Sequence, residues 1–355
     1  MTGPEPLPRG VRSRTATTGR LETHYLESGN ADGTPLVLLH GNCSSSRFWG
    51  ELMADVPDEY RVIAPDLRGY GDTATEPVDA TDGLGDFAAD VHALLVELGV
   101  DEPVAMVGWS NGGGVTMRYL RERPADVSVG VLVNPVSPYG FGGTVDVEGT
   151  PAYDDYAGSG AGAVNEDFVD ALAAGDRSAA ENTSPRSILR SFYVDPSTEL
   201  DSTLEEAYLD SVLSTAIGEG NYPGDVTESD NWPGFGPGTR GVNNAISPKY
   251  FDNSGIVDVS PKPPIHWIRG ETDSIVSNES FFDLGYLGQI GEVPGWPGEE
   301  VFGPQPMVDQ TRTVLEDYAD AGGDIEESVY EGVGHSPHIE APDRFREELL
   351  SVLAD

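Results

Sequence analysis

The residues Gly108-Trp109-Ser110-Asn111-Gly112 match the pattern Gly-x-Ser-x-Gly, with a strand-like run before them and a helix-like run after them. A serine hydroxyl is a weak nucleophile until a turn exposes it and a base takes its proton. A sharp strand-to-helix turn supplies that exposure, and it needs glycine where neighbouring backbone comes close. We therefore predict that Ser110 is a nucleophile, which requires a base and an orienting acid further along the chain.

The expected base is a histidine in a late loop. His335 follows a strand-like run and the residues Gly-Val-Gly, so its side chain is free to reach the end of a sheet. His338, three residues further on, is the competing histidine. We predict that His335 is the base and interpret His338 as a structural neighbour near the next helix.

The orienting acid should end a strand between the serine and the histidine. Asp273 ends the run Trp-Ile-Arg-Gly-Glu-Thr-Asp, and Glu271 is its rival two residues earlier. The other common position for this acid, just after the apolar run 127–134, holds Pro-Val-Ser and no carboxylate. This absence favours Asp273 as the acid.

A turn of small residues follows the first strongly apolar run of the chain and begins at Gly41. Such a turn can aim backbone N–H groups at an oxyanion, and we expect the N–H groups of Asn42 and Asn111 to do so. The N–H of Cys43 is the alternative to that of Asn42. Gly41 would let the backbone approach the substrate, and Trp109 is either a substrate contact or a residue packed beneath the serine turn.

The elements that must position these residues alternate between strands and helices. Two strands are expected around Thr18-Gly19, and the alternation that follows indicates a mostly parallel sheet with helices on both faces. The later predicted strands are 35–40, 60–66, 102–110, 127–134, 263–270 and, with its loop, 324–335; the predicted helices are 44–56, 84–99, 111–124, 306–322 and 342–355.

The alternation breaks between residues 138 and 262, where the chain is rich in Gly, Pro, Asn, Asp and Tyr and contains two helix-like pieces. We expect residues 1–137 and 263–355 to form one α/β core and residues 138–262 to form a cap inserted into it. A smaller insertion, at about 276–305, is rich in aromatic residues. We expect it to pack against the cap and narrow the site; a surface elaboration or an oligomer contact is the alternative.

Five features together resemble the α/β-hydrolase fold family: His-Gly-Asn after a strand, PDLRGYGDT, GWSNGG, the strand-end Asp273 and GVGHSPHIEAPDRF. The resemblance covers residues 20–137 and 263–355. It implies an eight-stranded, mostly parallel sheet flanked by helices, and it is strongest to the esterase, carbon–carbon hydrolase and haloperoxidase-like branches. Haloalkane dehalogenases and epoxide hydrolases of this fold carry Asp where this chain has Ser110, so both are disfavoured.

These residues predict ester hydrolysis through an acyl-enzyme on Ser110, with no organic cofactor and no metal. A carbon–carbon hydrolase of diketone-type substrates with the same triad is the alternative. It would be favoured by an arginine clamp for a substrate carboxylate, for which Arg186, Arg190 and Arg240 are the candidates. A non-catalytic ligand receptor on the same scaffold is a third class, and a complete triad argues against it.

The 355-residue chain carries 61 acidic and 20 basic residues, for a net charge of −41. This charge repels phosphates, so nucleic acid is not an expected partner. The acids are spread along the chain, a composition that resembles haloarchaeal proteins and predicts adaptation to high salt; an ordinary acidic enzyme is the alternative.

The chain has one cysteine, no signal-like N-terminus and no apolar run as long as a membrane span. These features predict a soluble cytoplasmic protein that has no intrachain disulfide and does not bind membranes. We expect a small-molecule substrate, and homo-oligomer formation stays open.

Overall fold

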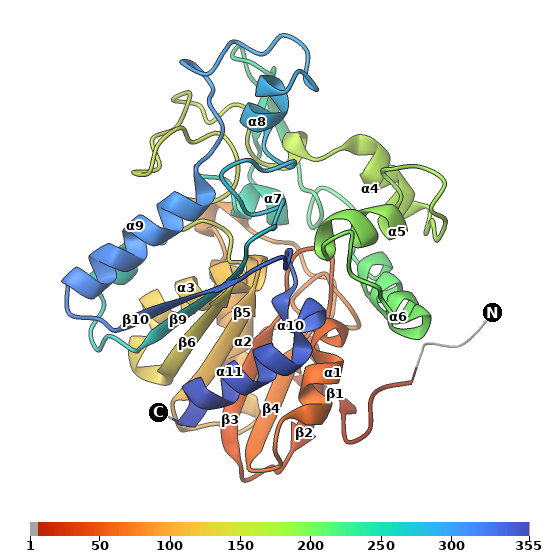
Figure 1. Cartoon of the computed structure of the whole chain (residues 1–355), viewed down its shortest axis with the longest axis vertical. Helices are drawn as coiled ribbons and strands as arrows, with labels where there is room; N and C mark the ends of the chain where they lie inside the picture. Colours follow the sequence, from red (N-terminus) through yellow and green to blue (C-terminus); the bar gives the residue numbers. More distant parts are fainter. Residues whose placement is uncertain (1–5, 355) are drawn as a thin grey trace.

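The computed structural model of the chain describes residues 6–354. Its main sheet has eight strands in the order β1-β2-β4-β3-β5-β6-β9-β10 (Figure 1). β2 runs antiparallel to its neighbours β1 and β4, whereas the other neighbouring pairs are parallel, so the predicted mostly parallel sheet is confirmed. The strands are β1 Arg12–Thr17, β2 Glu22–Gly29, β3 Thr34–Leu39, β4 Tyr60–Pro65, β5 Val104–Trp109, β6 Val127–Val133, β9 Ile265–Gly270 and β10 Ile325–Tyr330.

Helices cover both faces of this sheet, as the alternating pattern predicted. α1 and α11 pack together on one face, and α2, α3 and α9 lie on the other (Figure 1). The expected helix 44–56 is a 3-10 turn, Ser46–Trp49, followed by α1, and the Ser45 hydroxyl caps the turn by accepting a hydrogen bond from the Arg47 N–H. The helix bounds are α1 Gly50–Asp55, α2 Gly85–Glu97, α3 Asn111–Glu122, α9 Met307–Asp320, α10 Pro337–Glu340 and α11 Pro342–Ala354.

The central strands are buried on both faces, which explains their continuous apolar sequence. Every residue of β5 is buried, and Leu36, Val37, Leu38 and Leu39 of β3 are fully inaccessible to solvent. Because the parallel strands point the same way, the loops that follow β3, β5, β6, β9 and β10 meet at one edge of the sheet. The candidate site forms at this edge.

Most of residues 138–262, including α4–α7, lie beyond the same edge (Figure 1), whereas the turn Ser254–Asp258 packs against α3 and α9. The two helix-like pieces expected here are α4 and α6, whereas the shorter elements were not predicted. α5 continues directly into a π-helical turn, Leu189–Tyr193. The bounds are α4 Glu166–Ala173, α5 Pro185–Ile188, α6 Ser202–Leu213, β7 Val226–Glu228, β8 Phe235–Pro237 and α7 Val242–Ala245.

The insertion 276–305 contains one helix, α8 Leu284–Gln289, and packs against the 138–262 segment as expected. The Phe192 ring meets Phe282 edge-on at 5.0 Å between centroids, and Trp232 meets Phe302 in the same way at 4.9 Å. The Gln305 side chain adds hydrogen bonds to these aromatic contacts: its oxygen accepts from the Gly142 N–H at 2.6 Å, and its nitrogen donates to the Gly140 carbonyl at 3.1 Å. No helix within residues 6–354 combines the length and the apolar character that crossing a membrane requires.

Candidate active site

Ser110 lies at the turn between β5 and α3 with φ 56° and ψ −119°, a conformation that is strained for a residue with a side chain. The turn is held because the Ser110 N–H donates to the Val133 carbonyl at 2.9 Å and the Ser110 carbonyl accepts from the Val136 N–H at 3.0 Å. A Cβ on Gly112 would lie 2.3 Å from the Leu39 carbonyl oxygen, so glycine allows α3 to approach β3 this closely. Ser110 itself remains half-buried.

His335 and Asp273 form a nearly fully buried pair, with 2.8 Å between His335 Nδ1 and Asp273 Oδ2. A carboxylate only accepts hydrogen bonds, so Nδ1 carries the proton and Nε2 is left to accept one. Glu271, the rival acid, is exposed and accepts a hydrogen bond from the Gly332 N–H at 3.1 Å. The structure therefore brings Asp273, and not Glu271, to the histidine.

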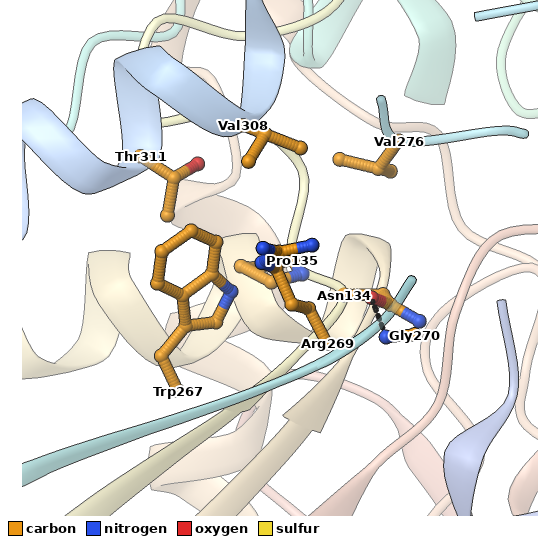
Figure 2. A pocket seen from close by; sticks show the side chains of 8 residues that line it. All are labelled: Asn134, Pro135, Trp267, Arg269, Gly270, Val276, Val308 and Thr311. Atoms are coloured by element: carbon orange, nitrogen blue, oxygen red, sulfur yellow. Dashed lines mark hydrogen bonds between the residues drawn. The ribbon is translucent and has the colours of Figure 1, made fainter. Parts of the chain in front are cut away.

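The backbone of His335 is fixed by two side chains. Its carbonyl accepts hydrogen bonds from Trp109 Nε1 at 2.7 Å and from Asn134 Nδ2 at 2.9 Å. Asn134 Oδ1 in turn accepts from the Gly270 N–H at 3.0 Å, and this bond is drawn in Figure 2. Asn134 thus joins the ends of β6 and β9 to the histidine loop, although the sequence patterns did not indicate it.

The pocket beside Asn134 does not contain the candidate triad. It lies between β9, α9 and the start of the 276–305 insertion, and its cavity volume is about 10 Å³, room for about one water molecule (Figure 2). Ligand pockets are usually larger, at about 300–1,000 Å³. We therefore do not assign this pocket to the substrate.

The turn after β3 lies against the nucleophile, because a Cβ on Gly41 would come within 2.9 Å of the Ser110 Cβ. Within residues 6–354, the backbone N–H groups of Asn42 and Asn111 donate to no protein acceptor. The Cys43 N–H already donates to the Asn42 side-chain oxygen at 3.1 Å. The two N–H groups expected to bind an oxyanion are therefore free to do so, whereas the alternative donor is engaged.

His40 anchors this turn through both of its ring nitrogens. The Leu67 N–H donates to Nε2 at 2.9 Å, so the proton is on Nδ1, which faces the Gly41 carbonyl at 2.8 Å. Burial lowers the pKa of His40 to about 4 and keeps the ring neutral. His40 therefore holds the Gly41 peptide in place as a hydrogen-bond donor.

Trp109 and Asn111 flank the serine in different ways. Trp109 is fully buried, stacks on Phe48 at 5.2 Å between ring centroids and uses its N–H on the His335 carbonyl. This position beneath the turn favours a structural role over a substrate contact. The Asn111 side chain is also buried, yet neither its oxygen nor its nitrogen has a partner within the described residues.

His338 is buried in α10, and its ring lies tilted against that of Trp49, with 4.1 Å between ring centroids. Burial, to which the neighbouring His335 adds, lowers the pKa of His338 to about 3. The ring is therefore neutral near pH 7. This environment supports the interpretation of His338 as a structural neighbour.

No group of three or more His, Cys, Asp and Glu residues between positions 6 and 354 is placed to hold a metal ion.

A model of the alpha/beta hydrolase family matches residues 36–348, and the chain belongs to this family. The fold and the arrangement of strand-end loops described above agree with that assignment.

Three curated relatives illustrate the range of activities among similar sequences. An uncharacterised carboxylesterase of Bacillus subtilis is 32% identical over 118 residues, covering 33% of this chain and 39% of the relative. A non-heme haloperoxidase of Rhodococcus erythropolis is 36% identical over 139 residues, covering 39% and 48%. The 2-hydroxy-6-oxo-6-(2'-aminophenyl)hexa-2,4-dienoic acid hydrolase of Metapseudomonas resinovorans is 33% identical over 103 residues, covering 28% and 34%. The chain thus matches between about a third and a half of each relative.

Solved structures extend the similarity across the whole fold. The esterase RhEst1 from Rhodococcus sp. ECU1013 superposes with a TM-score of 0.59 at 21% identity, covering 98% of this chain and 99% of that one. At this level of identity the match shows the fold alone.

Proposed function

We propose that this chain is a serine hydrolase that cleaves carboxylic esters through an acyl-enzyme on Ser110. The observation that carries the proposal is the buried His335–Asp273 pair, at 2.8 Å, at the same sheet edge as a strained serine turn. The unpaired N–H groups of Asn42 and Asn111 add donors for a developing oxyanion. Residues 138–262 would cover this edge as a cap.

In the proposed reaction, Ser110 Oγ attacks the ester carbonyl while His335 Nε2 takes its proton. The carbonyl oxygen becomes an oxyanion that accepts hydrogen bonds from the N–H groups of Asn42 and Asn111. His335 then gives the proton to the leaving alcohol, and the acyl group stays on Ser110. A water molecule, deprotonated by His335, releases the acid, and Asp273 stabilises the imidazolium in both steps.

The carbon–carbon hydrolase alternative is less well supported, although one relative carries such a name. An arginine clamp for a substrate carboxylate needs a guanidinium that is free to bind it. Arg186 and Arg190 both pair with Glu205, and Arg240 pairs with Glu219 at 2.7 Å. The three candidate arginines are thus engaged with carboxylates of the protein, which favours an uncharged ester over a carboxylate-bearing diketone.

The test is hydrolysis of p-nitrophenyl esters, from acetate to long chains, in multimolar KCl, by the parent and by Ser110→Ala. We expect the substitution to lower kcat by at least about 10⁴-fold. Ser336→Ala is the matched control, because its buried hydroxyl has no partner within the described residues; it should keep the parent activity. A folded parent that hydrolyses no ester, or an equally active Ser110→Ala variant, would overturn the proposal.

A further inference from the structure

Tyr193 connects the 138–262 segment to the candidate site. It ends the π-helical turn that follows α5, and its side chain is buried. Its hydroxyl lies 2.9 Å from the Asn42 carbonyl oxygen and 3.1 Å from that of Cys43, with the hydroxyl as donor. Its ring also stacks beside His335, at 6.4 Å between centroids. One side chain of this segment therefore contacts both the oxyanion turn and the base.

The oxyanion turn depends on contacts from outside itself. Cys43 has φ 42°, which is uncommon for a residue other than glycine and persists where the surroundings hold it. The Tyr70 hydroxyl donates to the Asn42 side-chain oxygen from the core side. Burial keeps the pKa of Tyr193 well above its usual value, so its hydroxyl stays a proton donor to the backbone of the turn.

The Asn42 N–H lies in the peptide plane of the Gly41 carbonyl, and the plane of the Asn42 carbonyl follows it across the Asn42 Cα. Peptide groups are planar, so fixing a carbonyl oxygen also fixes the N–H of the same plane. His40 and the Ser44 hydroxyl both bond the Gly41 carbonyl, each at 2.8 Å, and so hold the first plane. Tyr193 holds the carbonyl of Asn42 and thereby the second plane, so the backbone is anchored on both sides of the Asn42 Cα.

We propose that Tyr193 is a positioning residue, which anchors the backbone that follows the Asn42 Cα and so keeps the Asn42 N–H facing the oxyanion formed at Ser110. This inference rests on the proposed function, because that oxyanion arises only when Ser110 attacks a carbonyl. It also makes the oxyanion site dependent on the 138–262 segment. Packing of this segment against the core and alignment of the Asn42 N–H would then occur together.

The first test compares Tyr193→Phe with a matched control, Tyr208→Phe. Tyr208 lies in the same segment, is buried and stacks on Phe48 at 4.6 Å between centroids; within the described residues its hydroxyl has no hydrogen bond to the turn. Removing an oxyanion donor costs about 10²–10³-fold in kcat, and a misdirected donor should cost less, about 10–100-fold. We expect this loss in kcat for Tyr193→Phe, with KM within about threefold of the parent.

A transition-state analogue separates misalignment from general damage. A trifluoromethyl ketone forms a tetrahedral oxyanion on the serine, so its affinity should fall in proportion to kcat in Tyr193→Phe. The thermal midpoint should stay close to that of Tyr208→Phe. Tyr208→Phe should retain kcat and inhibitor affinity within about threefold of the parent.

Cys43 gives a second measurement that needs no turnover. It is the one cysteine of the chain, it is buried, and burial raises the pKa of its thiol to about 12. Because its carbonyl is a partner of Tyr193, a released turn should expose the thiol. We expect faster labelling of native Tyr193→Phe by a maleimide than of the parent or Tyr208→Phe.

The outcomes distinguish this inference from the proposed function. Equal kcat, inhibitor affinity and labelling in Tyr193→Phe and Tyr208→Phe would overturn the inference. Faster labelling of Tyr193→Phe with unchanged kcat would also overturn it. Tyr193 would then hold the oxyanion turn, but the reaction would not depend on that contact. A parent that hydrolyses no ester would sink the proposed function, and the labelling rates would still decide whether Tyr193 holds the turn.

Discussion

The central sheet and the two inserted segments are held in place by different kinds of contact. Leu36, Leu38 and Met106 in the sheet are fully buried among other apolar side chains. The 138–262 segment meets the core through polar groups as well, among them the Tyr193 hydroxyl and a 2.6 Å hydrogen bond between Ser45 and Ser211. The buried apolar strands therefore determine where the reactive residues lie. The inserted segments instead contact the backbone around those residues.

This difference divides the candidate site. Ser110 and His335 follow β5 and β10, and Asp273 follows β9, so every member of the proposed triad belongs to the sheet. The 138–262 segment supplies contacts to the oxyanion turn instead, through Tyr193 and Asn243. Substitutions at strand ends should therefore abolish the reaction, and substitutions in the inserted segments should reduce it or alter stability.

The largest effect is expected at the base. His335→Ala should lower kcat/KM for a p-nitrophenyl ester by at least about 10⁴-fold, since His335 is the base that takes the Ser110 proton in the proposed reaction. His338→Phe is the control, because it keeps a ring against Trp49 and should retain most of the activity. An active His335→Ala variant would show that the base is another residue. The strand-end loops of the sheet would then not supply the whole triad.

A smaller loss is expected at Asn134, which positions the His335 loop from the end of β6. Asn134→Gly tolerates the backbone φ of 38° but removes three side-chain hydrogen bonds, with the Gly270 N–H and with the Gly334 and His335 carbonyls, so kcat should fall by about 10–100-fold with little change in KM. The control is Asn253→Ala, which removes a buried bond to the Gly114 carbonyl on α3. Asn253→Ala should lower thermal stability alone. Equal kinetics in both variants would assign Asn134 to stability.

The inserted segments should respond to pH through Asp283. Burial raises the pKa of this carboxyl from 3.8 to about 6, and its hydrogen bonds come from the backbone N–H groups of Tyr286 and Gln305. Between these two pKa values the folded state binds more protons than the unfolded state. The free energy of unfolding should therefore fall as pH rises from about 4 to about 6, by about 1–3 kcal/mol.

Asp283→Asn should remove this dependence. Relative to the parent, the variant should gain stability between pH 4 and pH 7, as measured by denaturant unfolding at each pH. Asp154→Asn, at an exposed position, is the control and should follow the parent curve. Parallel curves for the parent and Asp283→Asn would mean that the buried carboxyl does not oppose folding of the 276–305 insertion.

The smallest effect per charged group is expected from added salt, which should stabilise the central sheet and the inserted segments alike. A net charge of −41 repels itself, and added KCl screens this repulsion, so the thermal midpoint should rise between 0.1 and 2 M KCl. Each surface charge contributes little, about 0–1 kcal/mol. Sucrose at equal osmolality is the uncharged control. A midpoint that does not rise in KCl would contradict the proposed adaptation to high salt.

The sequence predicts the sheet well because buried parallel strands leave continuous apolar runs. The bounds expected for 60–66, 102–110 and 127–134 lie within two residues of β4, β5 and β6. The Gly-x-Ser-x-Gly turn and the strand-end acid follow from the same pattern, because each comes directly after such a run. The sequence favours Asp273 over Glu271 as the acid. The hydrogen bond with His335 that distinguishes the two carboxylates is visible only in the structure.

The inserted segments could not be predicted in the same detail. Tyr193 meets Asn42 across a separation of 151 residues, and no periodic pattern marks such a contact. The π-helical turn that presents it and the short elements around it leave no apolar repeat. Asn134 could not be predicted for another reason: an uncharged amide at a strand end does not match the carboxylate that a catalytic acid requires.

The most direct test of the central claim is covalent labelling of the folded protein with a fluorophosphonate, followed by peptide mapping. Such a reagent phosphonylates a serine that has an active base. The account predicts one modified residue, Ser110, in the parent and in Ser336→Ala, and no modification in His335→Ala. A folded parent that stays unlabelled, or that carries the label at another residue, would contradict the assignment of Ser110, His335 and Asp273 as the catalytic triad.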